Sequence, residues 1–584
     1  MTENTPEIKL IGVAASPGIV IGPVRILAGE LCETPRTSIV PERMTDEINK
    51  LRKALSESVS ELEHFYRKTA AAYGEQAAQI FQVHQSILTD PMVIGECEEL
   101  IRTEYLAADF AFTEVMDKYI DRLAQMADEI FRSRHADIRD LKRRVVRHVQ
   151  GKAAKPLRFE RPSIVFAREL TPSDTMRLER DLVLGFAMDF GARTSHATIL
   201  ARSIRVPAVV GLSHAGEALR DDDTVILDGE EGVLIVNPSP ETISEYQKRR
   251  RDYLRVVEKL EKIRTLPART LDGRDVELAC NIEFADEVDS IQDLSDGVGL
   301  YRTEYLYLTR DDLPTEEEQI DEYKKILLKL NGKPLIVRTF DLGGDKPPRF
   351  LQLAKEQNPF LGIRGVRLYF NGAHNLFRTQ LRAILRAGVF GDVRIMLPMI
   401  TCVSEISMCR RVVEEIKAEL QRDGLKFAEQ VPLGAMIEVP SAAATADIIA
   451  RECEFLSIGT NDLIQYTVAV DRGNKNLNYL YQPYHPAVLR LIADTIQKGH
   501  EQGVWVGMCG EMAGDPLMTM VLIGMGLDEF SVSPVSLLHI KEIIRGVHVS
   551  ECELFTRRVL SLSSVEEIQD FLKQTFQQKF GQQA

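Results

Sequence analysis

The stretch LGAMIEVPSAAATADIIARECEFLSIGTNDL, residues 433–463, contains one strand–helix–strand unit of the predicted fold. Two short apolar runs, LGAMIEV and FLSIG, enclose a segment long enough for a crossover helix, which is typical of neighbouring parallel strands. Polar residues stand at the end of each run, with Glu438 in the first and Asn461 and Asp462 after the second. Because parallel strands end at one common edge, these side chains are expected to lie close together.

The same alternation of strand and helix extends from Pro267 to the C-terminal region. Eight candidate strands are recognised there: VELACNI, GVGLY, PLIVRTF, VRIMLPMI, LGAMIEV, FLSIG, VWVGMCG and EFSVS. The first seven are each followed by enough sequence for a helix, and roughly 310 residues suit one (β/α)8 barrel with some long loops. A doubly wound open sheet is the alternative, but it explains less readily why polar residues, Asn281 among them, follow the strands.

Charged residues gather at the ends of these strands and on the adjoining loops. Four are arginines, two at strand ends and two on loops: Arg302, Arg338, Arg364 and Arg472. A planar guanidinium can bind a carboxylate or phosphate through two hydrogen bonds, so this group predicts a small ligand with several negative charges. Glu438 and Asp462 either pair with the arginines or hold a divalent metal such as Mg²⁺. Cys509 lies at the same end and is a candidate proton donor or nucleophile.

The first half of the chain has a different pattern. Residues 41–156 contain few prolines and glycines, and an apolar stripe at helical spacing runs from Ile48 to Tyr66. A second helix over residues 75–88 and two more after Pro91 complete a predicted bundle, whose pattern is interrupted at Pro91 and Gly95. The bundle carries no catalytic constellation of its own.

From about residue 161, short apolar runs between turn residues predict a compact α/β region: SIVFA, DLVLGFAM, PAVVG, TVILD and GVLIV. Residues 240–267 then form one highly charged predicted helix. A nucleic-acid-binding arm is one interpretation, but the interleaved Glu258 and Glu261 favour a solvated linker. The chain also carries 72 Lys and Arg against 87 Asp and Glu, a net charge of −15, which argues against a nucleic-acid partner.

Cysteine usage and hydropathy bear on the compartment. The 584 residues include eight cysteines with no Cys-x-x-Cys pair, which favours a reducing environment. No basic N-terminal region precedes a long apolar run, and no segment reaches about 18 uncharged apolar residues, so neither a leader nor a membrane span is predicted. A cytoplasmic protein without a membrane partner is therefore expected.

The sequence GARTSHATILAR, residues 191–202, combines a turn with the start of a helix. Thr194 and Ser195 precede His196, and the apolar positions that follow are spaced as in a helix. A helix N-terminus attracts anions through its free backbone N–H groups and its dipole. His196 is therefore a candidate to carry a phosphoryl group.

Seven motifs follow one another along the chain in the order found in a known protein family: LTPSDT, GARTSHATILARS, VPAVVG, GVGLYRTE, NPFLGIRGVR, IGTNDL and MCGEMAGD. Together they resemble enzyme I of the bacterial phosphoenolpyruvate-dependent phosphotransferase system, from ASPGI at residues 15–19 to GMGLDEFS at residues 524–531. The resemblance implies that phosphoenolpyruvate and a histidine react to give pyruvate and phosphohistidine. Transfer to the carrier protein HPr, the first step of sugar uptake, would follow.

The resemblance also assigns roles to individual residues. It implies that His196 is phosphorylated on its ε nitrogen, that Thr175 in LTPSDT orients it, and that Cys509 gives a proton to the leaving enolate. It implies a substrate-binding set of Arg302, Arg338, Arg364, Asn461, Asp462 and Arg472. It further implies that Glu438 and Asp462 ligate Mg²⁺, with Mn²⁺ as a substitute.

These parts combine into an α/β multidomain fold, with a helical bundle inserted in an α/β phosphohistidine domain and a (β/α)8 barrel after it. The expected boundaries are 1–30 for the first strands of the phosphohistidine domain, 31–152 for the HPr-docking bundle, 153–239 for the rest of the phosphohistidine domain, 240–267 for the linker helix and 268–584 for the barrel. The barrel is expected to bind phosphoenolpyruvate and to form a homodimer.

Three other functions agree less well with the sequence. A dikinase or phosphoenolpyruvate synthase would add a nucleotide-binding region, but no GxxxxGK[ST] loop occurs in the sequence. A regulatory, nitrogen-type phosphotransferase branch would add an N-terminal sensory domain, whereas this sequence begins almost directly at ASPGI. A non-catalytic scaffold would not need the charged residues and the cysteine at the strand ends.

Overall fold

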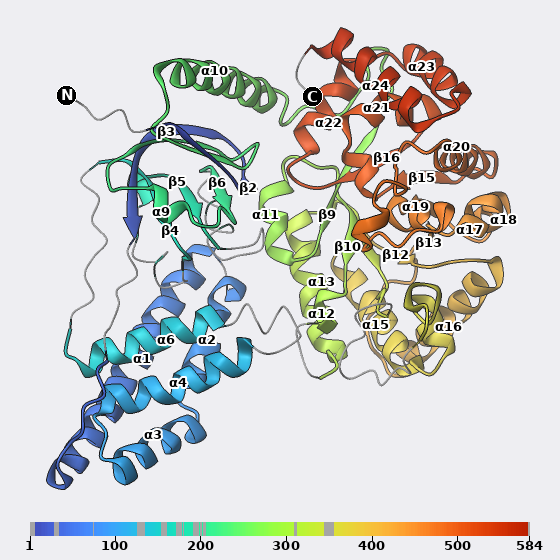
Figure 1. Ribbon diagram of the computed structural model, residues 1–584. Coiled ribbons are helices and arrows are strands. Elements are labelled where there is room, and N and C mark those ends of the chain that lie inside the picture. Colours follow the sequence, from blue (N-terminus) through green and yellow to red (C-terminus); the bar gives the residue numbers. More distant parts are fainter. Residues whose placement is uncertain are drawn as a thin grey trace. The chain divides into compact units, whose positions relative to one another are not determined.

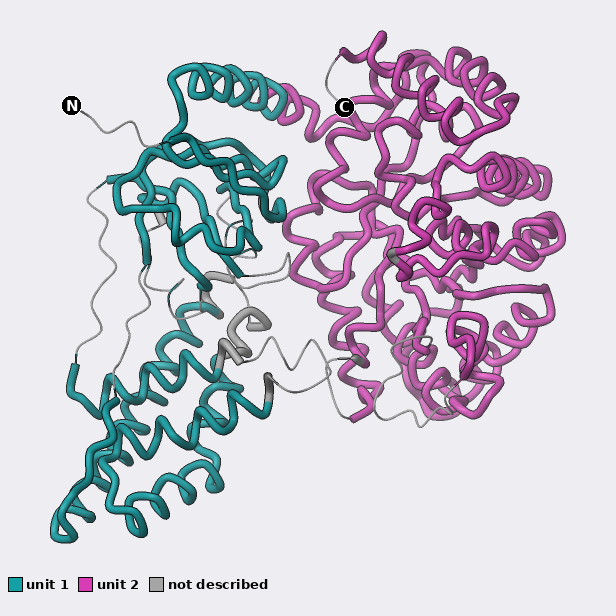
Figure 2. Tube along the Cα trace, viewed as in Figure 1, with its two compact units in different colours: residues 1–257 teal, residues 258–584 magenta. Residues whose placement is uncertain are grey.

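The computed structural model describes residues 6–27, 34–73, 75–124, 135–152, 161–170, 180–190, 206–308, 312–343 and 356–581, and the single residues 174, 178, 198 and 201. The chain divides into two compact units, residues 1–257 and 258–584 (Figure 2). Each unit has hydrophobic clusters of its own. Among the described residues no helix is both long and apolar enough to cross a membrane.

The second unit is built on a closed barrel of parallel strands (Figure 1). Its strands are β9 Glu277–Ile282, β10 Val298–Arg302, β11 Leu335–Arg338, β12 Val393–Leu397, β13 Leu433–Ile437, β14 Phe455–Ile458, β15 Trp505–Met508 and β16 Glu529–Val532. Consecutive strands pair in parallel, and β16 pairs with β9 to close the ring. All eight predicted strands are present, so the barrel is confirmed and the open sheet is excluded.

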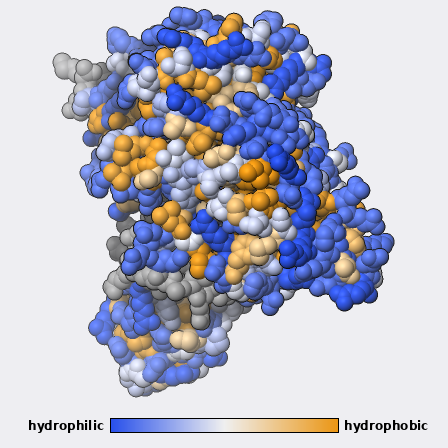
Figure 3. Space-filling view, turned by 90° about the vertical axis from the view of Figure 1, so that its right-hand side faces the viewer, coloured by the Kyte–Doolittle hydropathy of each residue, from blue (hydrophilic) through white to orange (hydrophobic). Residues whose placement is uncertain are grey.

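Helices surround this barrel (Figure 1). They are α11 Val288–Ile291, α12 Tyr305–Leu308, α13 Glu316–Leu330, α14 Val366–Phe370, α15 His374–Ala387, α16 Val403–Arg422, α17 Pro440–Ala444, α18 Ala446–Ala450, α19 Thr460–Val468, α20 Pro486–Glu501, α21 Pro516–Met525, α22 Leu537–Arg545, α23 Val549–Ser561 and α24 Val565–Phe580. Their apolar faces belong to one large core, in which α23 and α24 pack on α21 rather than on the strands. The side seen in Figure 3 is mainly hydrophilic, with scattered apolar patches.

Side chains that are mostly apolar fill the barrel interior. Leu300, Ile336 and Met436 are buried there together. Trp505 stacks on Phe455 with ring centroids 5.0 Å apart and an interplanar angle of 9°. The interior is therefore a packed core, as in other barrels of this architecture.

The first unit contains a mixed eight-stranded sheet in the order β1-β8-β7-β3-β4-β5-β6-β2. The strands are β1 Ile8–Ile11, β2 Val13–Ser16, β3 Ile19–Leu27, β4 Ser163–Ala167, β5 Val183–Met188, β6 Ala208–Val210, β7 Thr224–Asp228 and β8 Val233–Val236, with α9 Ala215–Ala218 and α10 Pro240–Lys262 after β6 and β8. Because β3 pairs with both β4 and β7, one sheet is made from residues on both sides of the bundle. The bundle is thus an insertion, as predicted.

The inserted bundle consists of α1 Met44–Tyr73, α2 Glu75–Leu88, α3 Pro91–Glu104, α4 Ala108–Ala124 and α6 His135–Val149. Three described helices follow Pro91 rather than the two predicted. Pro91 starts α3 instead of merely interrupting a pattern, because the Asp90 side chain accepts the Met92 N–H at 2.8 Å and caps the helix. Gly95 lies inside α3, and no atom stands within 4 Å of where its Cβ would be, so the predicted break there was wrong.

A charged cluster joins α6 to α1 within the bundle. Glu61 Oε2 lies 2.8 Å from Arg144 Nη1, 2.7 Å from Arg147 Nη2 and 3.0 Å from His148 Nε2. Burial alone would raise the pKa of the Glu61 carboxyl, but the hydrogen bond with His148 and the two guanidinium charges outweigh it and lower the pKa to about 2. The carboxylate therefore stays charged across ordinary pH and holds the two helices together.

Candidate active site at the barrel mouth

A cavity of about 500 Å³ opens at the carboxyl ends of the barrel strands. It is lined by every barrel residue that the sequence placed in the site: Arg302, Arg338, Arg364, Glu438, Asn461, Asp462, Arg472 and Cys509. They come from strand ends and loops spread over 208 positions of sequence numbering, from 302 to 509. The barrel thus brings the eight residues into one site.

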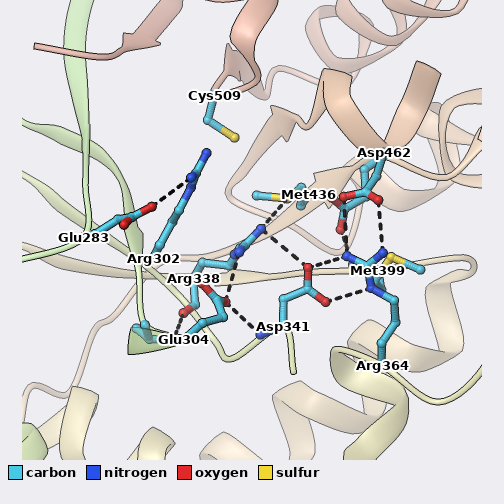
Figure 4. A network of polar contacts seen from close by, with 12 residues as sticks. Glu283, Arg302, Glu304, Arg338, Asp341, Arg364, Met399, Met436, Asp462 and Cys509 are labelled. Atoms are coloured by element: carbon cyan, nitrogen blue, oxygen red, sulfur yellow. Dashed lines mark hydrogen bonds and ion pairs between the residues drawn. The ribbon is translucent and has the colours of Figure 1, made fainter. Parts of the chain in front are cut away.

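Arg338, the last residue of β11, is fixed by carboxylates on both sides (Figure 4). Its Nη2 lies 2.9 Å from Glu304 Oε1, and its Nη1 lies 3.6 Å from Asp341 Oδ2. Burial by itself would lower the pKa of this guanidinium, but the charges of Glu304, Asp341 and Glu438 raise it above its usual value. Arg338 is therefore a permanently charged and well-oriented donor at the cavity wall.

Arg364 spans two carboxylates at the other side of the cavity (Figure 4). Its Nε and Nη2 donate to the Asp341 oxygens at 3.1 and 2.6 Å, and its Nη1 and Nη2 donate to the Asp462 oxygens at 3.0 and 3.4 Å. Nη1 also donates to the Tyr466 hydroxyl at 3.2 Å. All five N–H donors of the guanidinium are thus engaged by protein groups.

The other two arginines are more accessible. Arg302 Nη1 donates to Glu283 Oε1 at 3.0 Å, and the side chain is 39% exposed. Arg472 is exposed on the loop after α19, with its backbone N–H bound to Gln465 Oε1 at 3.1 Å. Both guanidiniums can turn toward a ligand at small cost, because neither is enclosed by buried partners.

Glu438 and Asp462 form a carboxylate pair in the cavity. Glu438 is 1% exposed, and its Oε1 accepts the Met399 N–H at 2.6 Å. Burial, followed by the nearby charges of Asp462 and Asp341, raises the pKa of the Glu438 carboxyl to about 8. Such mutual repulsion between oxygen ligands is what a bound divalent cation relieves, so the pair fits Mg²⁺. Among the described residues no group of three His, Cys, Asp or Glu side chains is arranged to hold a metal ion.

Sequence reasoning missed further carboxylates that line the cavity: Glu283, Glu304, Asp341 and Glu511. With Glu438 and Asp462 they make six carboxylates beside four arginines. The arginines therefore do not form the simple positive patch that the sequence suggested. Two of these carboxylates could have been predicted from their spacing in the sequence. Glu304 follows Arg302 by two residues and Asp341 follows Arg338 by three, so both lie just past the same strand ends.

Cys509 lies directly after β15, beside the apolar floor of the cavity. Its side chain packs with Leu300 and Met436 and the residue is 3% exposed. Burial raises the pKa of the thiol to about 11, against smaller lowering effects of the Ser457 hydroxyl and the Arg338 charge. The thiol therefore carries its proton at neutral pH, which suits a proton donor better than a nucleophile.

Asn461 faces the same opening and is held by Glu511. Its Nδ2 donates to Glu511 Oε1 at 3.3 Å, and its Oδ1 accepts the Glu511 N–H at 3.2 Å. The paired contacts fix the amide at the rim. Two further predicted site residues, His196 and Thr175, lie outside the described residues.

Family models and relatives agree on the class of protein. The chain matches the N-terminal domain of PEP-utilising enzymes over residues 11–134, their mobile domain over 159–232 and their PEP-binding domain over 257–549. The chain is thus a PEP-utilising enzyme, in agreement with its barrel fold. The phosphoenolpyruvate-protein phosphotransferase of Priestia megaterium is 43% identical over 577 residues, covering 98% of this chain and 99% of its own. That of Bacillus subtilis (strain 168) is 42% identical over 573 residues, covering 97% and 100%.

Among solved structures, the solution structure titled Enzyme I (nEIt) is 38% identical with a TM-score of 0.36, covering 42% of this chain and 99% of that one. The extent and identity of the curated relatives settle the family. This chain belongs to the phosphoenolpyruvate-protein phosphotransferases and is an enzyme of the transferase class. The resemblance drawn from the motifs is confirmed.

Proposed function

We propose that this enzyme moves the phosphoryl group of phosphoenolpyruvate to His196 and then to the carrier protein HPr, as the first step of sugar uptake. One observation carries the proposal. Eight residues that the motifs assign to phosphoenolpyruvate chemistry line a single cavity in a chain of the phosphoenolpyruvate-protein phosphotransferase family.

The substrate would bind through charge pairing at the mouth. Phosphoenolpyruvate carries a carboxylate and a phosphate, and the accessible guanidiniums of Arg302 and Arg472 can each bind one through paired hydrogen bonds. Arg338, held by Glu304 and Asp341, offers a third charge in a fixed direction. Asn461 at the rim adds a neutral donor for the phosphate end. Positioning and charge neutralisation of this kind are the main requirements of phosphoryl transfer.

The chemistry balances with the groups present. The bond between phosphorus and the enol oxygen breaks, its electron pair stays on that oxygen, and a bond from the ε nitrogen of His196 to phosphorus forms, with Thr175 orienting the imidazole. The enolate then takes the proton of the Cys509 thiol at its methylene carbon, which gives pyruvate and a thiolate that water reprotonates. The thiol is suited to this step because it keeps its proton at neutral pH.

A divalent cation completes the proposed site. Glu438 and Asp462 would hold Mg²⁺, or Mn²⁺ in its place, since carboxylate oxygens are the ligands these ions prefer. The cation would supply electrostatic stabilisation of the phosphate charge. Arg364, whose donors are engaged by Asp341 and Asp462, would orient these carboxylates in addition to the substrate-binding role that the motif assigns to it.

The partners and the location are also proposals. The inserted bundle would dock HPr, and the barrel unit would form a homodimer, both on the strength of the family resemblance. A cytoplasmic location is supported by eight cysteines of which seven are described, all unpaired.

The test is labelling with phosphoenolpyruvate that carries a marked phosphate. The wild-type enzyme should gain one acid-labile phosphate per chain in Mg²⁺ and lose it to HPr, while His196→Ala gains none. A chelator should prevent labelling, and Mg²⁺ or Mn²⁺ should restore it. Label that persists in His196→Ala on another residue would overturn the assignment, and full labelling in chelator would overturn the metal site.

A further inference from the structure

The carbonyl group of Cys509 lies beyond the end of the β15–β16 ladder. Main-chain pairing between these strands reaches Gly507 with Glu529 and Met508 with Phe530. On the other side the Cys509 N–H still donates to Ile458 O of β14 at 3.1 Å. The Cys509 carbonyl therefore has no strand partner on the β16 side and needs a donor from elsewhere.

Asn281, near the end of β9, supplies this donor across the barrel interior. Its Nδ2 donates to Cys509 O at 3.0 Å. Because β16 stands between β9 and β15 in the closed ring, the Asn281 side chain reaches over one strand to the next. The link connects positions 228 residues apart and exists only because the barrel closes through β16 and β9.

Ser531 on β16 fixes which way the Asn281 amide faces. The Ser531 hydroxyl, on a residue that is 0% exposed, donates to Asn281 Oδ1 at 2.6 Å. With the amide oxygen held by the hydroxyl, the amide nitrogen must face Cys509 O. The reverse orientation would bring two acceptor oxygens together at the Cys509 carbonyl.

The other side of Cys509 is restrained by close packing. A Cβ on Gly510 would lie 1.9 Å from Thr460 Oγ1, so the backbone after Cys509 passes directly against the start of α19. The Cys509 peptide is thus held by Ile458 and Thr460 on one side and by Asn281 on the other. Removing the Asn281 donor would free only one of these restraints, so the barrel should stay folded while the thiol is less well aimed.

We propose that Asn281 and Ser531 are positioning residues that aim the Cys509 thiol at the methylene carbon of the enolate. The inference rests on the proposed proton-donor role of Cys509. Proton transfer to carbon requires the donor at hydrogen-bond range and in line, and a displacement of about 1 Å costs on the order of a hundredfold in rate. Neither side chain lines the substrate cavity, so binding of phosphoenolpyruvate should not depend on them.

The test compares Asn281→Ala, Asn281→Asp and Ser531→Ala with the control Ser533→Ala, which removes an exposed hydroxyl two residues further along and bonded to Ser536. We expect Asn281→Ala to lower kcat for pyruvate formation about tenfold to a hundredfold, with KM for phosphoenolpyruvate changed less than twofold. Asn281→Asp should lower kcat at least as much, because a carboxylate then faces the Cys509 carbonyl. Ser531→Ala should fall between wild type and Asn281→Ala.

A solvent isotope effect separates positioning from general damage. If proton delivery becomes slower, the ratio of kcat in H₂O to kcat in D₂O should increase in the Asn281 variants and stay at the wild-type value in Ser533→Ala. The melting temperature followed by Trp505 fluorescence reports whether the barrel remains folded. Loss of kcat and of substrate affinity by equal factors, or an unchanged isotope effect, would overturn the proposal.

The same assays distinguish this inference from the proposed function. If Cys509→Ala forms pyruvate as fast as wild type, the proton-donor role fails, and the positioning role fails with it. If Cys509→Ala is slow but Asn281→Ala matches wild type, only the positioning inference fails.

Discussion

Replacing Arg364 with methionine tests whether the ion network beneath the cavity supports the barrel. The change removes all five donors that reach Asp341, Asp462 and Tyr466 while keeping much of the side-chain volume. The carboxylates it leaves are 5% and 8% exposed. Removing one partner of a buried ion pair costs about 3–5 kcal/mol, because the remaining charge stays buried.

This loss of unfolding free energy corresponds to a lower melting temperature. An unfolding entropy of about 2.1 cal/mol/K per residue gives roughly 0.7 kcal/mol/K for residues 258–584, so a loss of about 4 kcal/mol lowers the melting temperature by about 6 °C. Fluorescence of Trp505 measures this directly, since it is the only tryptophan of the chain and lies in the barrel. The measurement is made in chelator, so that no cation replaces the guanidinium.

Arg367→Met is the matched control, because among the described residues the Arg367 side chain donates only to the carbonyl oxygens of Leu361 and Gly362. It should melt within about 1 °C of wild type, because replacing the half-buried Arg367 leaves no buried charge without its partner. Arg364→Met combined with Asp341→Asn should recover part of the loss, because the uncompensated charge is removed. A melting temperature of Arg364→Met equal to that of the control would refute the reasoning.

Two further predictions concern titration. Burial raises the pKa of the Cys509 thiol to about 11, so its reactive thiolate form is scarce at neutral pH. Alkylation of Cys509 by iodoacetamide, mapped by mass spectrometry, should therefore become about tenfold faster per pH unit up to that pKa. A rate that stops increasing below pH 9 would contradict this. Glu61→Gln should destabilise α1 and α6 by ~3 kcal/mol at neutral pH, measured by amide hydrogen exchange. Since the folded pKa of Glu61 is lowered to about 2, the stabilisation by its carboxylate is complete above the ordinary pKa of 4.5 and disappears as pH falls toward 2. If the stability lost in Glu61→Gln is the same from pH 6 to pH 3, the carboxylate is not the source of the stabilisation.

The barrel and most of its mouth could be predicted because they depend on local patterns. A short apolar run predicts a strand, and the residue at or just beyond its end lies at the common edge of the barrel, which is how Arg338 and Cys509 were found. Pro91 in the helical bundle shows where prediction from local sequence stops. A proline both ends one helix and starts the next, and only the cap from Asp90 shows which role applies.

The rest of the site depends on contacts between distant positions. The sequence identified Arg364 as a cation in the site. It did not show that Asp341 and Asp462 engage the hydrogen-bond donors of Arg364, because these bonds join residues up to 98 positions apart. The bond from Asn281 to Cys509 likewise needs the closed ring, which the strand count alone does not provide. Pairing of charges is thus set by tertiary geometry, whereas the presence of charges at strand ends can be read from sequence.

The surplus of carboxylates over guanidiniums at the mouth has a consequence for how a substrate enters. Among the described residues, carboxylates line the mouth beside the four guanidiniums, so an approaching anion such as phosphoenolpyruvate meets negative as well as positive groups. The divalent cation proposed at Glu438 and Asp462 would offset part of this negative charge as the substrate enters. On the proposed function, the apparent affinity for phosphoenolpyruvate should then increase with free Mg²⁺.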